Sequence, residues 1–153
     1  MTTLPTVADF ELPSTGNKTF KLSEHLNHLL IIYFYPKDAT PGCTTQGQQF
    51  RDHYAEFQAL NVEIVGVSRD SIKSHESFKA KYQFPFDLLA DTEEIACQIF
   101  DVIKMKNMYG KQVRGIQRST FIINAQGQII REWRNVKVDG HIAEILAFLR
   151  QAS

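Results

Sequence analysis

The chain has 153 residues, of which 43% are hydrophobic, and its 17 basic and 17 acidic side chains give a formal net charge of zero. This length predicts a single domain, residues 1–153, that buries its own core. The charge balance argues against nucleic acid or an anionic membrane as a partner. No apolar stretch approaches the ~20 residues of a membrane span. The N-terminus lacks the pattern of a secretory signal, and two cysteines without a disulfide framework predict a cytoplasmic protein.

The first half of the chain alternates strand and helix patterns. Residues 5–23 form an N-terminal segment with a hairpin turn expected at residues 14–17. Residues 29–35 and 62–67 are continuous apolar runs, as expected for strands buried on both faces of a sheet. Residues 44–60 and 72–82 carry apolar side chains every three to four positions, which predicts a helix after each of these strands.

The second half continues the pattern and then changes it. A short strand is expected at residues 86–90, followed by a helix that runs from a cap at Asp91 or Thr92 to about Asp101. Residues 117–123 and 128–133 predict a hairpin, and residues 140–150 predict a final amphipathic helix. The order of elements predicts an α/β fold in which a mixed central sheet has helices on both faces.

One cysteine lies in an unusual loop. Cys43 comes shortly after the apolar run at residues 29–35, stands in a Thr-Pro-Gly turn, and directly precedes the helical pattern. Free backbone N–H groups and the positive dipole end at a helix N-terminus favour an anion. Because the thiolate is the nucleophilic form of cysteine, we expect Cys43 to be a reactive thiolate. The alternative is a cysteine buried as a small hydrophobic residue.

The spacing of Pro36, Thr40 and Cys43 resembles the active-site loop of the peroxiredoxins. The longer string DATPGCT at residues 38–44, followed by FRD at 50–52, resembles the branch called bacterioferritin comigratory protein or peroxiredoxin Q. Similar segments extend the resemblance over nearly the whole chain: ADFELP (8–13), GVS (66–68), FDLLAD (86–91) and RSTFII (118–123). The resemblance implies a thioredoxin-like fold in its peroxiredoxin elaboration. It also implies thiol-dependent reduction of hydrogen peroxide and organic hydroperoxides.

The resemblance assigns candidate catalytic residues as well. It implies that Cys43 attacks the peroxide and becomes a sulfenic acid, and that Arg118 holds both the sulfur and the peroxide. Thr40 is expected to accept from the peroxide while it donates to the thiolate, and Pro36 to pack the loop and exclude water. The alternative roles are an Arg118 paired with a surface carboxylate, a Thr40 that only forms the turn, and a Pro36 that only ends its strand. No cofactor and no metal ion are expected.

The chain departs from the family pattern at two positions. Many members of the branch have a second cysteine where this chain has Gln48, others have it in the seventies or eighties of this numbering, and the only other thiol here is Cys97. We therefore expect a one-cysteine reaction in which thioredoxin, glutaredoxin or a small thiol reduces Cys43. A Cys43–Cys97 disulfide is the alternative, and a purely structural Cys97 is favoured over it. Gln46 replaces a glutamate that is frequent in relatives, and we expect this to tune activity rather than remove it.

Two other classes of function would use the same thiol. A thiol-disulfide oxidoreductase of thioredoxin type needs Cys-x-x-Cys, and Gln46 at the second position argues against it. A non-enzymatic redox sensor or holdase needs only Cys43 and stays open as an alternative. Relatives of this branch are often monomers, so we expect a monomer in preference to a dimer.

Overall fold

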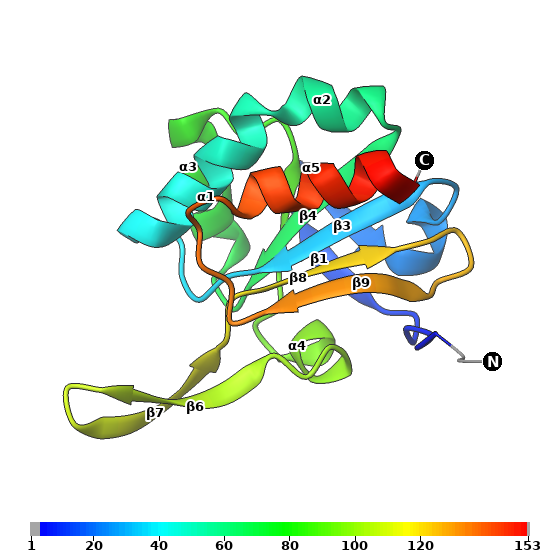
Figure 1. The fold of residues 1–153 in the computed structure, drawn as a ribbon. Coiled ribbons are helices and arrows are strands. Elements are labelled where there is room, and N and C mark those ends of the chain that lie inside the picture. Colours follow the sequence, from blue (N-terminus) through cyan, green and yellow to red (C-terminus); the bar gives the residue numbers. More distant parts are fainter. Residues whose placement is uncertain (1–3, 153) are drawn as a thin grey trace.

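The computed structural model describes residues 4–152, and its centre is a seven-stranded sheet in the order β2-β1-β5-β4-β3-β8-β9 (Figure 1). Strands β3, β4 and β5 run parallel to one another, whereas the other neighbours are antiparallel. This confirms the predicted mixed sheet. The strands are β1 (Glu11–Ser14), β2 (Lys18–Lys21), β3 (Leu29–Phe34), β4 (Val62–Ser68), β5 (Asp87–Ala90), β8 (Ser119–Ile123) and β9 (Ile129–Arg134).

Helices cover both faces of this sheet (Figure 1), as predicted. One face carries α1 (Pro41–Asp52), α2 (Tyr54–Ala59), α3 (Ile72–Tyr82) and α5 (His141–Ala152), and the other carries α4 (Ile95–Ile99). A short 3-10 helix, η1 (Leu22–His25), follows β2. Within residues 4–152, no helix has the length and apolar content needed to cross a membrane.

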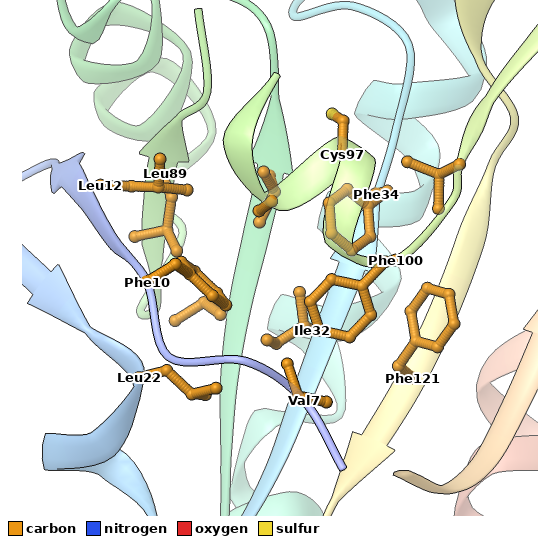
Figure 2. Packing of buried hydrophobic residues seen from close by; sticks show 14 of the residues in the cluster. Val7, Phe10, Leu12, Leu22, Ile32, Phe34, Leu89, Cys97, Phe100 and Phe121 are labelled. Atoms are coloured by element: carbon orange, nitrogen blue, oxygen red, sulfur yellow. The ribbon is translucent and has the colours of Figure 1, made fainter. Parts of the chain in front are cut away.

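The sheet separates two hydrophobic cores. Successive side chains of a strand point to opposite faces, so Ile32 and Phe34 of β3 enter one core while Ile31 and Tyr33 enter the other. Both faces are covered by helices, which explains why the run at residues 29–35 is apolar at every position. Figure 2 shows the core beneath α4, where Cys97 packs beside Phe34 and Phe100.

The bounds predicted for the helix at residues 44–60 were wrong. It begins earlier because Pro41 occupies the first helical turn, where its fixed φ is suitable and its missing N–H costs nothing. It is also divided, since His53 leaves the helical conformation (φ −105°, ψ 11°) and ends α1 before α2 begins.

The helix predicted from Asp91 to Asp101 is shorter than expected. The Asp91 carboxylate does accept the N–H groups of Ile95 and Cys97, at 2.7 and 2.8 Å, and so acts as a cap. However, Glu94 adopts a left-handed conformation (φ +60°), which prevents the helix from extending back to Asp91. Only Ile95–Ile99 is helical.

A second, two-stranded sheet was not predicted from the sequence. Strands β6 (Ile103–Met108) and β7 (Lys111–Ile116) form a hairpin that projects from the body of the protein (Figure 1). Its two-residue turn, Tyr109-Gly110, has positive φ at both positions (53° and 79°), which is the pattern of a type I′ turn. The dipeptide ending in Gly was the available signal, but the flanking residues are mainly lysine, methionine and amides rather than an apolar alternation.

Gly47 lies in close contact with the side chains packed against α1, and its replacement by alanine should destabilise the protein. A Cβ atom there would lie 2.4 Å from Cζ of Phe84, whose ring is held by Phe86 and Phe78. Alanine is normally better than glycine in a helix by ~1 kcal/mol. Here we expect Gly47→Ala to lower the free energy of unfolding by about 1–3 kcal/mol because of overpacking.

Urea denaturation measures this effect. Thr45→Ala, at an exposed position of the same helix, is the matched control and should leave stability unchanged or slightly raised. A Gly47→Ala protein that unfolds at the same or a higher urea concentration than the wild type would contradict the packing described here.

Candidate active site

Cys43 is the third residue of α1. The helix begins after Thr40, whose extended backbone (φ −81°, ψ 155°) takes the N-cap position. The Cys43 side chain is only 2% exposed and belongs to the core between the sheet and α1. Its sulfur therefore lies in the first helical turn, where backbone N–H groups without intrahelical partners and the helix dipole favour negative charge.

Sheet register brings Arg118 to this cysteine. Arg118 immediately precedes β8, and the first residue of that strand pairs with Phe34 at the end of β3. The Arg118 side chain thus reaches the loop that follows β3, and its Nη2 donates to Sγ of Cys43 at 3.5 Å. Gly42 leaves space for this approach, because a Cβ atom there would lie 3.1 Å from Nη2.

Gln46 accepts a hydrogen bond from the other terminal nitrogen of the guanidinium. Arg118 Nη1 donates to Oε1 of Gln46 at 2.6 Å, and Gln46 is 1% exposed. Within residues 4–152, the buried Nε2 of Gln46 has no hydrogen-bond partner. The guanidinium fork therefore joins two residues of α1 and has a fixed orientation beside the sulfur.

This arrangement predicts a limited effect for Gln46→Glu. A carboxylate would keep the contact with Arg118 and would remove the unpaired buried amide nitrogen, but it would also place a second anion beside a Cys43 thiolate. Because these effects oppose one another, we expect the rate constant with hydrogen peroxide to stay within about tenfold of the wild type. Stopped-flow oxidation measures it, and a change of several orders of magnitude in either direction would contradict this reading of the Gln46–Arg118 contact.

Thr40 and Pro36 lie in the same loop, but Thr40 does not make the predicted bond to Cys43. Its hydroxyl donates instead to the carbonyl oxygen of Lys37 at 2.8 Å, so the proton is used within the turn. The hydroxyl oxygen retains acceptor capacity. Pro36, which has no N–H to donate, lines a cavity of about 410 Å³ together with Arg118. The remaining lining residues are Lys104, Met105, Lys106, Gln117, Asn135 and Val136.

Lys106 is a further cation near the site that the sequence analysis did not identify, because it lies on the hairpin that was missed. Its ammonium group donates to the carbonyl oxygen of Ile116. Burial and the neighbouring charge of Arg118 lower the pKa of Lys106, whereas the charge of Cys43 acts in the opposite direction. The cavity is therefore lined by three basic side chains, those of Lys104, Lys106 and Arg118.

Cys97 is not brought to this site. It is 0% exposed and belongs to the core under α4 (Figure 2), whereas Cys43 belongs to the core on the other face of the sheet. Both thiols are free. Burial, followed by the charge and hydrogen bond of Asp91, raises the pKa of the Cys97 thiol well above its usual range. Such a thiol is a poor nucleophile.

Comparisons with known proteins agree with this architecture. Residues 5–132 match the model of the AhpC/TSA family. The chain is 53% identical over 146 residues to Peroxiredoxin Bcp of Xanthomonas campestris pv. campestris, covering 94% of this chain and 91% of the relative. It is 47% identical over 145 residues to Peroxiredoxin Bcp of Bacillus subtilis, covering 95% and 92%.

Solved structures give the same result. A structure of the Xanthomonas campestris bacterioferritin comigratory protein, studied for its alkyl peroxide reduction activity, has a TM-score of 0.90 at 49% identity and covers 98% of this chain and 96% of that one. A structure of a cysteine-to-serine mutant of Xanthomonas campestris peroxiredoxin Q has a TM-score of 0.91 at 50% identity, covering 99% and 97%. These similarities confirm the thioredoxin-like fold. The chain therefore belongs to the AhpC/TSA family, and within it to the peroxiredoxins of the Bcp, or peroxiredoxin Q, branch.

Proposed function

We propose that this protein is a thiol-dependent peroxidase that reduces hydrogen peroxide and organic hydroperoxides at Cys43. The main support is the guanidinium of Arg118, which lies 3.5 Å from the Cys43 sulfur at the N-terminus of α1. A buried thiol with a fixed cation beside it can serve as a nucleophile and stabilise a leaving anion. The alkyl peroxide reduction attributed to the Xanthomonas campestris relative is consistent with this chemistry.

The first step joins sulfur to oxygen. The Cys43 thiolate attacks one oxygen of ROOH, the S–O bond forms as the O–O bond breaks, and RO⁻ leaves and takes up a proton to become ROH. Arg118 orients the sulfur and stabilises the negative charge that passes to the leaving oxygen. The Thr40 hydroxyl oxygen accepts from the peroxide O–H, and Pro36, which has no N–H, packs the loop and keeps water from the sulfur. Cys43 is left as a sulfenic acid.

The second step uses an external thiol. A thiolate from thioredoxin, glutaredoxin or a small thiol attacks the sulfenic sulfur and displaces hydroxide, which leaves as water. A second thiol then attacks the mixed disulfide and releases Cys43. This order is supported by the position of Cys97 in the opposite core and by Gln48 in place of a nearby thiol. The monomeric state and the cytoplasmic location stay predictions.

Peroxide consumption by the wild-type protein tests the proposal. With dithiothreitol as reductant, hydrogen peroxide and cumene hydroperoxide should both disappear much faster than without protein. Replacing dithiothreitol in turn by a thioredoxin system and a glutaredoxin system identifies the protein reductant. No acceleration with any reductant would refute the peroxidase. Slow oxidation that changes partner binding would instead favour a redox sensor or holdase.

A further inference from the structure

A buried polar cluster connects the Cys43 loop to α3. Asp38, five residues before Cys43, is 7% exposed, and His75 of α3 is 0% exposed. Nδ1 of His75 lies 2.7 Å from Oδ2 of Asp38, and Nε2 lies 2.8 Å from the carbonyl oxygen of Leu89 at the end of β5. None of these groups belongs to the site built around Arg118.

The hydrogen bonds define the protonation of this pair. The Leu89 carbonyl only accepts, so Nε2 of His75 must carry a hydrogen. The Asp38 carboxylate also accepts from the Tyr35 hydroxyl at 2.6 Å and the Ser74 hydroxyl at 2.7 Å. Burial alone would raise the pKa of Asp38, but these hydrogen bonds together with the bond and charge of His75 hold it below its usual value. An ionised Asp38 requires a hydrogen on Nδ1 of His75 too, which makes the ring an imidazolium.

The loop around Asp38 needs side-chain hydrogen bonds to keep its conformation. Ala39 has a left-handed backbone (φ +64°), which a residue with a Cβ atom adopts only when its surroundings enforce it. The Asp38 N–H donates to Oδ2 of Asp70 at 2.9 Å, and the Ser68 hydroxyl donates to the same oxygen at 2.5 Å. The loop is thus fixed by side chains that follow β3 and β4 and by α3, immediately before the turn that carries Cys43.

We propose that Asp38 and His75 form a buried ion pair that holds the Cys43 loop in the conformation that reacts with peroxide, with His75 as a positioning residue. This inference rests on the proposed peroxidase function. The ion pair also bears on the reduction by an external thiol. Cys43 is 2% exposed, so such a thiol reaches its sulfur only when the loop moves. The ion pair therefore favours the peroxide step and opposes access by large reagents until the loop opens.

The ring protonation of His75 is measured first. In protein labelled with ¹⁵N at histidine, both ring nitrogens of His75 should give imidazolium shifts at neutral pH. A neutral tautomer with one unprotonated nitrogen would overturn the ion pair. Because no peroxide is used, this result is independent of the proposed function. A wild-type protein that does not react with peroxide would refute that function, and the spectrum would still decide the ion pair.

The positioning role is measured with Asp38→Asn and His75→Gln. Each is compared with His53→Gln, which removes a partly exposed histidine whose Nδ1 lies 3.1 Å from Oε1 of Glu56. We expect the rate constant with hydrogen peroxide to fall by about 10- to 100-fold in the first two variants. Alkylation of Cys43 by iodoacetamide should not fall, because a loosened loop exposes the sulfur.

Two results would overturn the role. Peroxide rate constants within about twofold of the wild type, with only a lowered melting temperature, would make the pair merely structural. A parallel fall in peroxide and iodoacetamide rates would mean that the variants reduce the thiolate population rather than its positioning. If one variant does not fold, the other variant and the ring spectrum of the wild type still decide the proposal.

Discussion

Cys43→Ser should lose hydroperoxide reduction almost completely. Serine is close to cysteine in size and keeps the position at the start of α1, but its hydroxyl is not ionised at neutral pH and cannot replace the thiolate. We expect the residual rate to be below about one thousandth of the wild-type rate, as is usual when a covalent nucleophile is removed. The measurement is peroxide consumption with saturating dithiothreitol.

Cys97→Ala is the matched control for this loss. It removes the only other thiol, which is buried in the opposite core, and the small cavity should cost about 1 kcal/mol of stability. Activity should remain close to that of the wild type. If Cys43→Ser retains activity, or if folded Cys97→Ala loses it, Cys43 is not the residue that reacts with peroxide.

Arg118→Met should give the second largest loss. The substitution keeps the length of the side chain but removes the charge and both hydrogen bonds, to Sγ of Cys43 and to Oε1 of Gln46. We expect the rate constant with hydrogen peroxide to fall by about 100-fold, which corresponds to ~3 kcal/mol of transition-state stabilisation. Arg118→Lys should recover only part of it, because an ammonium carries the charge without the fork that holds both partners.

Arg131→Met tests whether the loss is specific to this position. Arg131 lies on β9 with its guanidinium 4.6 Å from the centre of the Trp133 ring, so its replacement changes the net charge equally without touching Cys43. Its peroxide rate constant should stay within about threefold of the wild type. Equal rates for the wild type and Arg118→Met would show that the guanidinium takes no part in the reaction.

The central strands of the main sheet could be predicted from the sequence, because strands buried on both faces are apolar at successive positions. The run at residues 29–35 is apolar at every position, and the structure places it at the centre of the fold as β3. The pairing of Cys43 with Arg118 was predictable only through the family resemblance. Its physical cause is the register between β3 and β8, a long-range contact that no local pattern encodes.

Besides the β6–β7 hairpin, sequence reasoning missed buried polar groups, which it could not recognise without knowing their partners. His75 reads as an ordinary polar residue of an amphipathic helix, yet it is fully buried because Asp38 and the Leu89 carbonyl satisfy its ring. Lys106 reads as a solvated charge, yet it lines the cavity beside Arg118. A buried polar residue is recognised only when its hydrogen-bond partners are known.

The intact mass of fully reduced protein after one equivalent of hydrogen peroxide, with no thiol added, shows directly whether Cys43 reacts alone. We expect a gain of one oxygen as a sulfenic acid that dimedone traps at Cys43, because Cys97 lies on the other side of the sheet. A loss of two hydrogens would contradict it by showing a Cys43–Cys97 disulfide. An unchanged mass would contradict the peroxidase chemistry itself.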